Sequence, residues 1–186
     1  MREAVIVAHE ERCLGSQRLY KGRILNLRRD QVELENGARS DREVIEHNGG
    51  VCVAALDPQG KLLLVRQYRY PYGKELLELP AGKREKDEDP MVCGARELEE
   101  ETGYRAESLE KLGELYPTPA YDTEIIHIYL ARGLTPSRQH LDENEFLDVV
   151  PMDFEEALGM VMRGEIPDAK TQIGILKLAM LRQGKE

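Results

Sequence analysis

The sequence contains no tryptophan and only two phenylalanines, so its core must be built mainly from aliphatic side chains. It has no run of 18 consecutive apolar residues, which excludes a membrane-spanning helix. Its cysteines are three, an odd number, and they lack the paired spacing of a zinc site. Cys52, in an apolar run, is expected to be buried. These absences predict a cytoplasmic protein with reduced thiols and no membrane partner.

Basic residues are the minority, with 26 Lys and Arg against 35 Asp and Glu and a net charge of −9. Without a basic stripe to neutralise phosphates, nucleic acid is not an expected partner. The negative charge is concentrated, because residues 77–101 hold nine acidic and four basic side chains. Such a concentration is typical either of a solvated acidic face or of a metal site.

Apolar patterning and turn residues predict a mixed α/β chain. Helices are expected at 90–102, 153–163 and 168–183, each after an aspartate cap. Strands are expected at 3–13, within 23–47 around an Asn36-Gly37 turn, and at 51–56, 62–65, 76–79, 107–116 and 124–132. The strands at 51–56 and 62–65 are joined by a short turn and are expected to form a buried hairpin.

The first 47 residues are expected to form an antiparallel β extension that is too small to bury its apolar face alone. Residues 48–186 would form the main domain. We therefore expect residues 1–47 to pack against another surface.

The helix at 90–102 would direct one stripe toward the core, formed by Met91, Ala95, Leu98 and Thr102. Three carboxylates would lie away from that stripe, those of Glu97, Glu100 and Glu101. A solvated acidic face would explain such a cluster. Their closeness to the turn Pro80-Ala81-Gly82 favours a site for a hard cation such as Mg²⁺.

Seven residues of this sequence have the spacing of the fixed positions in the 23-residue signature of the Nudix hydrolases, which the sequence therefore resembles. The seven residues are Gly82, Glu88, Arg96, Glu97, Glu100, Glu101 and Gly103. This sequence departs from the signature only at Tyr104, which is a packing position. The resemblance implies an α/β/α sandwich around a mixed sheet, with the N-terminal β extension added to it.

Further segments resemble the ADP-ribose pyrophosphatase subfamily. Pro119 lies 15 residues after Tyr104, where that subfamily has a characteristic proline. The other similar segments are Arg42-Glu43, Arg66–Arg69, Glu78–Gly82, Glu124 and Leu141–Glu145. Together they extend the resemblance over about residues 18–183.

The resemblance also implies roles for individual residues. Glu97 and Glu101 correspond to the primary Mg²⁺ ligands, with Mn²⁺ a possible substitute. The metal set is completed by Glu100, the Ala81 carbonyl and Glu145, which is also an alternative base. Arg96 would orient this cluster, and Glu143 corresponds to the general base on a loop.

The same resemblance suggests which residues bind the substrate. Arg42 and Arg69 suit phosphate or adenine, although both could equally be ordinary strand-face arginines. Glu124 and the turn Thr118, Pro119 and Ala120 correspond to contacts with the terminal ribose. An aromatic residue that often stacks on adenine is missing at Gly22-Arg23-Ile24, where Tyr20 or Arg23 could substitute.

The expected activity is Mg²⁺-dependent hydrolysis of ADP-ribose to AMP and ribose 5-phosphate by a homodimer that exchanges its N-terminal segments. A hydrolase of another nucleotide sugar, such as GDP-mannose, is the alternative enzyme. A nucleotide-sensing Nudix domain without catalysis is less compatible with an intact signature. RNA decapping would be expected to bring a basic surface, which is absent.

Overall fold

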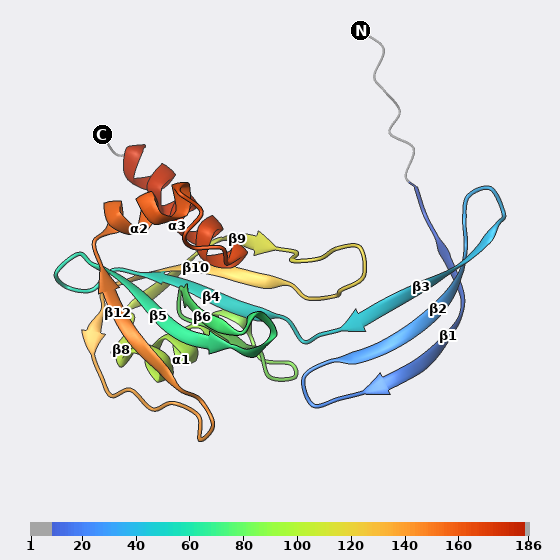
Figure 1. Ribbon diagram of the computed structural model, residues 1–186, viewed down its shortest axis with the longest axis horizontal. Helices are drawn as coiled ribbons and strands as arrows, with labels where there is room; N and C mark the ends of the chain where they lie inside the picture. Colours follow the sequence, from blue (N-terminus) through green and yellow to red (C-terminus); the bar gives the residue numbers. More distant parts are fainter. Residues whose placement is uncertain (1–8, 185–186) are drawn as a thin grey trace, which may run out of the picture. The chain divides into compact units, whose positions relative to one another are not determined.

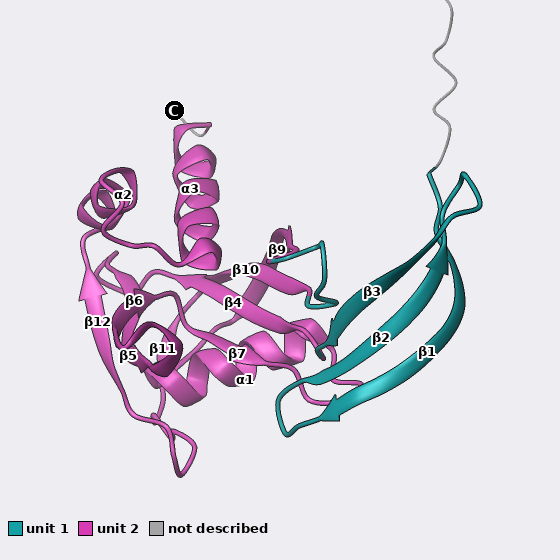
Figure 2. Ribbon diagram, turned by 45° about the vertical axis from the view of Figure 1, so that its right-hand side comes forward, with its two compact units in different colours: residues 1–47, 118–124 teal, residues 48–117, 125–186 magenta. Residues whose placement is uncertain are grey.

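The computed structural model describes residues 9–184, which divide into two units (Figure 2). Within that range, unit 1 comprises residues 9–47 and 118–124, and unit 2 comprises residues 48–117 and 125–184. Unit 1 therefore includes a short segment from the second half of the chain.

Unit 1 is a three-stranded antiparallel sheet in the order β1-β2-β3. Its strands are β1 (Arg12–Lys21), β2 (Asn26–Glu33) and β3 (Arg39–Glu46). The predicted turn between β2 and β3 is confirmed, because Gly37 adopts a φ of 77° and the Asn36 side chain accepts a hydrogen bond from the Ala38 N–H at 2.9 Å. The segment 118–124 joins β3, since the Ile45 N–H donates to the Tyr121 carbonyl at 2.7 Å.

The strand expected at 3–13 is confirmed only at Arg12 and Cys13 among its described residues. Residues 9–11 are not in a strand, and β1 begins at Arg12 and continues to Lys21; residues 3–8 lie outside the described residues. Every residue of β1 is exposed. A strand with no buried face has no alternation of apolar and polar residues, so its sequence does not reveal it.

Unit 2 contains two larger sheets and one two-stranded pair (Figure 1). The first sheet has the order β7 (Ala81–Lys83), β4 (Gly50–Ala55), β10 (Ile126–Arg132) and β9 (Ser108–Leu115). The second has the order β12 (Leu147–Met152), β5 (Leu62–Arg69) and β6 (Lys74–Glu78). The pair consists of β8 (Tyr104–Arg105) and β11 (Thr135–Pro136). Since β4 and β10 run parallel and β4 and β7 antiparallel, the first sheet is mixed.

The expected hairpin between 51–56 and 62–65 is wrong. Both strands exist, as β4 and β5, but they belong to different sheets and share only the isolated bridge between Leu56 and Leu62. β4 bonds to β7 and β10, whereas β5 bonds to β6 and β12. A short apolar run shows that a strand is buried without showing which strand it pairs with.

Helices cover both faces of the first sheet. The helices are α1 (Pro90–Thr102), α2 (Phe154–Met162) and α3 (Ala169–Gln183), with a 3₁₀ turn, η1 (Tyr70–Tyr72), after β5. Alternate residues of β4 divide between two cores: Val51 and Val53 pack with Leu98 of α1, whereas Cys52 and Ala54 join the core that contains α2 and α3. This arrangement confirms the expected α/β/α sandwich around a mixed sheet, and Cys52 is fully buried as predicted.

No helix within residues 9–184 is both long enough and apolar enough to cross a membrane.

Candidate metal centre

Helix α1 carries most of the candidate site, and its ends are those predicted from the sequence. The Asp89 side chain accepts hydrogen bonds from the N–H groups of Met91 and Val92 at 2.8 and 3.2 Å. Pro90 occupies the first turn, and Gly103 ends the helix with a φ of 72°. These caps fix where the carboxylates of α1 begin and end.

The predicted buried stripe of α1 is wrong at two of its four positions. Leu98 and Thr102 are buried, but Met91 and Ala95 are exposed. The buried face instead includes Glu101, whose exposed fraction is 2%. The apolar residues alone therefore did not predict the buried face of α1, because this helix directs a carboxylate toward the protein interior.

Two glutamates of α1 meet the start of β7. The turn expected at Pro80-Ala81-Gly82 is wrong at Ala81 and Gly82, because both residues pair with β4 as part of this strand. The Ala81 N–H donates to Glu101 Oε2 at 2.9 Å. A Cβ on Gly82 would lie 1.9 Å from the carboxyl carbon of Glu97, so only glycine leaves room for this side chain. The structure thus brings together Ala81, Glu97 and Glu101, as the sequence predicted.

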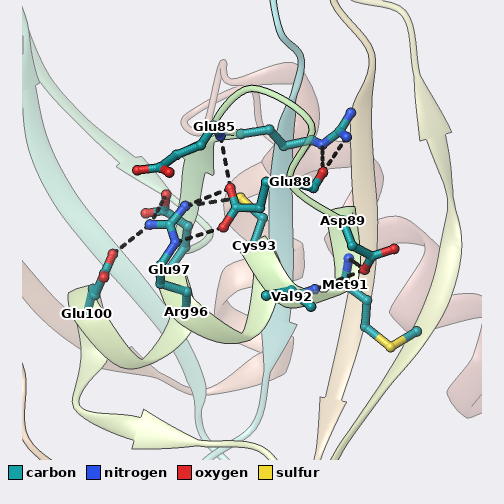
Figure 3. A network of polar contacts seen from close by, with 10 residues as sticks. Glu85, Glu88, Asp89, Met91, Val92, Cys93, Arg96, Glu97 and Glu100 are labelled. Carbon is teal, nitrogen blue, oxygen red and sulfur yellow. Dashed lines mark hydrogen bonds and ion pairs between the residues drawn. The ribbon is translucent and has the colours of Figure 1, made fainter.

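Arg96 connects three carboxylates, as Figure 3 shows. Its guanidinium donates to both oxygens of Glu88 at 3.0 and 3.1 Å and to Glu100 Oε2 at 2.8 Å. It also lies 2.8 Å from Glu97 Oε1. These contacts raise the pKa of Arg96 and lower the pKa of Glu88 to about 2. Arg96 therefore orients the cluster, and Glu88 is its structural partner.

Burial makes Glu97 and Glu101 unusual carboxylates. Loss of solvent raises the pKa of Glu97 to about 7, against the opposing effect of Arg96. It raises the pKa of Glu101 to about 8, against the hydrogen bond from Ala81. The charge of Glu145 raises both further. A bound cation would relieve this burial cost, because an opposite charge favours the ionised form.

The donor chemistry fits a hard divalent ion, which prefers carboxylate and carbonyl oxygens. In the described chain, no three acidic, histidine or cysteine side chains are already grouped tightly enough to hold a metal ion. Arg96 holds Glu97 and Glu100 by ion pairs. An ion at this site would therefore compete with Arg96 for the Glu97 carboxylate.

The loop before β12 brings one of its two candidate glutamates to the cluster. Glu145 is partly buried and accepts a hydrogen bond from the Gln67 side chain of β5 at 3.3 Å. Glu143 is exposed in the turn closed by the Glu145 N–H and the Asp142 carbonyl at 2.9 Å. The sequence does not distinguish these positions, because both are acidic residues of one short loop.

Arg69 is engaged within unit 2. Its Nε and Nη2 donate to the two oxygens of Glu78 at 2.6 and 2.8 Å. Glu78 has an exposed fraction of 2% and also pairs with Lys170 of α3. This buried network was not anticipated, since no spacing in the sequence links residues 69, 78 and 170.

The remaining candidate substrate residues lie in unit 1. Arg42, on β3, donates to Glu11 and to the Ser40 hydroxyl. Thr118, Pro119 and Ala120 form a turn in which the Thr118 carbonyl accepts from the Asp122 N–H at 3.0 Å. Glu124 lies 3.2 Å from His47 Nδ1, a pairing that the scattered histidines did not predict.

A family model described as "NUDIX domain" matches residues 46–172. The chain belongs to the Nudix family. A second model, described as "Nucleoside diphosphate sugar hydrolase N-terminal domain", matches residues 11–45 of this Nudix protein.

Named relatives cover most of this Nudix chain. It is 42% identical over 92% of its length to a protein of Bacillus methanolicus named "Methanol dehydrogenase activator", and covers 94% of it. It is 40% identical, over 92% of its length and 94% of the relative's, to "ADP-ribose pyrophosphatase" of Bacillus subtilis (strain 168). A "GDP-mannose pyrophosphatase" of Cronobacter sakazakii (strain ATCC BAA-894) is also 40% identical, over 72% of this chain and 74% of the relative.

A solved structure supports the fold over most of the chain. The crystal structure of a protein titled "ADP compounds hydrolase" superposes with a TM-score of 0.83, over 95% of this chain and 96% of the other. Their sequence identity is 22%.

Proposed function

We propose that this protein is a Mg²⁺-dependent hydrolase that splits the diphosphate of ADP-ribose to AMP and ribose 5-phosphate. The observation that carries the proposal is the placement of Glu97 and Glu101 at the start of β7, where Glu101 is buried and the Glu97 side chain is 13% exposed, within a complete Nudix signature. The similarity to an ADP-ribose pyrophosphatase over 92% of the chain supports this choice of substrate.

The proposed metal set is Glu97, Glu101, Glu100, Glu145 and the Ala81 carbonyl. Bound Mg²⁺ would neutralise the negative charge of the diphosphate and favour deprotonation of the attacking water. Arg96 holds the carboxylates in place while no ion competes for them. Mn²⁺, which prefers similar oxygen ligands, would be able to replace Mg²⁺.

Glu143 is the proposed general base, and Glu145 the alternative. A glutamate in an exposed loop can approach the water once substrate is bound, which would couple binding to proton removal. Arg42, Arg69, Thr118, Pro119, Ala120 and Glu124 remain proposed substrate contacts. For Arg69, binding a phosphate would require its guanidinium to share or leave Glu78.

GDP-mannose is the second candidate substrate, because a GDP-mannose pyrophosphatase is also 40% identical, over a smaller share of the chain. Hydrolysis rates on ADP-ribose, GDP-mannose and other nucleotide sugars, with and without Mg²⁺, distinguish the two. A higher kcat/KM for GDP-mannose would overturn the ADP-ribose assignment. Binding without any cleavage would instead indicate a nucleotide sensor.

Glu101→Gln tests the metal centre itself. The amide keeps the size of the side chain and an oxygen that can accept from Ala81, but it removes the charge that binds the ion. Turnover should fall by more than about a hundredfold, which exceeds the usual effect of replacing a residue that only supports a metal ligand. The free energy of unfolding of the metal-free protein at pH 8 should not fall, because the ionised buried carboxylate is itself costly.

Glu99→Gln is the matched control, since Glu99 is on the same helix but pairs with Arg105 and Ser137 outside the cluster. Its turnover should remain close to that of the unaltered protein. Equal activity of Glu101→Gln and Glu99→Gln would refute the proposed centre.

A further inference from the structure

The N-terminus of α3 contacts the strand end that leads to the candidate metal centre. The Thr171 hydroxyl donates to Asp168 Oδ2 at 2.6 Å and accepts from the Leu79 N–H at 2.8 Å. Thr171 is fully buried. The hydroxyl is therefore fixed both as a donor, to the helix cap Asp168, and as an acceptor, from the backbone of Leu79.

Two neighbouring contacts hold the same strand end. Lys170 forms an ion pair with the buried carboxylate of Glu78. Gly174, one turn further along α3, lies so close that an added Cβ would be 2.5 Å from Cδ1 of Leu79. Residues 78 and 79 are thus positioned by α3 through a charge, a hydrogen bond and packing.

The next residues of the chain reach the carboxylates. The Pro80 carbonyl accepts from the Val53 N–H at 2.9 Å, which fixes the turn to β4. Ala81 then donates to Glu101, and Gly82 lies against the Glu97 carboxylate. Only Pro80 separates Leu79 from Ala81, so a shift of Leu79 would pass directly to the start of β7, which contacts Glu97 and Glu101.

We propose that Thr171 is a positioning residue for the metal centre, acting through Leu79 on Ala81 and Gly82 at the start of β7. The inference rests on the proposed function, because it assigns Thr171 to that same centre. Without the hydroxyl, the buried Leu79 N–H loses its acceptor, and a buried donor without a partner favours a rearranged backbone. Nothing in the Nudix signature includes Thr171, which lies 68 residues beyond its last glycine.

The test compares Thr171→Val, which removes only the hydroxyl function at nearly constant volume, with Thr171→Ser, which retains it. Binding of Mn²⁺ to each folded protein is measured by calorimetry, and kcat and KM for ADP-ribose are measured separately. In Thr171→Val the affinity for Mn²⁺ should fall about tenfold or more, as for other outer-shell groups, and kcat should fall while KM changes little. Thr171→Ser should restore both.

Val161→Ala controls for a general loss of stability, since Val161 is a buried residue of α2 in the same core. Both it and Thr171→Val should lower the midpoint of urea unfolding, but only Thr171→Val should weaken Mn²⁺ binding. Equal weakening in the two variants, or unchanged Mn²⁺ affinity in Thr171→Val, would overturn the inference. If Thr171→Val does not fold, Thr171→Ala, which leaves room for a water molecule, is judged by the same comparison.

The proposed function and the role of Thr171 can fail separately. If the unaltered protein binds no Mn²⁺ and cleaves no nucleotide sugar, the proposed function fails and the inference fails with it. If the unaltered protein binds Mn²⁺ and Thr171→Val binds it equally well, only the role of Thr171 is refuted.

Discussion

At the scale of single residues, Glu88 shows how one signature position can serve structure rather than metal binding. Both its oxygens accept from Arg96, one of them also accepts from the Glu85 N–H at 2.9 Å, and its side chain is only 14% exposed. Arg96 is thereby held where it also reaches Glu97 and Glu100. The contribution of Glu88 is therefore best tested by measuring the free energy of unfolding.

Glu88→Gln should destabilise the protein in a pH-dependent way. The pKa of Glu88 is lowered from 4.5 to about 2 in the folded state, chiefly by the Arg96 hydrogen bonds. Its ionised form therefore stabilises the fold above about pH 4.5, by about 3 kcal/mol at most, and this contribution is lost as the pH falls toward about 2. Urea unfolding of both proteins between pH 7 and about pH 3 measures the difference.

The expected result is a gap in unfolding free energy that is largest near neutral pH and narrows with acid. Glu85→Gln is a useful control, because Glu85 binds Glu88 through its backbone N–H and carbonyl groups, which the substitution leaves in place. A difference in unfolding free energy that is the same at every pH would show that the charge of Glu88 does not contribute to stability.

At the scale of elements, the loop between β11 and β12 gives different surroundings to two candidate bases that are two positions apart in the sequence. Glu145 is held by Gln67 near Glu97 and Glu101, whereas Glu143 is exposed. A residue near the metal ligands should affect ion binding, and a residue that acts only on water should affect rate alone.

Glu143→Gln should therefore lower kcat by about a hundredfold or more while changing Mg²⁺ affinity little. Glu145→Gln should weaken Mg²⁺ binding, because it removes a carboxylate beside the proposed ligands. Turnover as a function of Mg²⁺ concentration separates the two effects. Full activity in Glu143→Gln would transfer the role of base to Glu145 or to another residue.

The elements that the sequence predicted are those with local signals. Aspartate caps and terminal glycines predicted α1, α2 and α3, and Asn36-Gly37 predicted the turn after β2. β1 was not located, because all its residues are exposed, and the pairing of β4 with β10 was missed, because it joins segments more than 70 residues apart. Local patterns predict elements better than they predict partners.

The same limit applies to the site. The family resemblance pointed to Glu97, Glu101 and Ala81-Gly82, because helical spacing and glycine are visible in the sequence. The apolar periodicity placed Glu101 on the wrong face of α1, since a buried carboxylate contradicts the apolar pattern that defines a buried stripe. The supporting contacts of Glu78, Lys170 and Thr171 depend on the tertiary fold and leave no pattern in the sequence.

At the scale of the whole molecule, the sheet of unit 1 exposes apolar side chains that need a partner. Leu19 and Tyr20 of β1 are 45% and 58% exposed, and Ile24, after β1, is 57% exposed. A three-stranded sheet with an apolar face rarely remains uncovered in water. We propose that a second copy of the chain covers it, as the subfamily resemblance implies, and that each active site is completed across the dimer.

Leu19→Lys should then shift the protein from dimer to monomer in sedimentation velocity at micromolar concentration, because a charge would be buried at the subunit contact. Met162→Lys, at an exposed apolar position of α2 in unit 2, should leave the sedimentation coefficient unchanged. If active sites are shared, kcat/KM of Leu19→Lys should rise with protein concentration as dimers re-form. A monomeric unaltered protein with full activity would refute the shared site, and would leave the exposed face of β1 to a different partner.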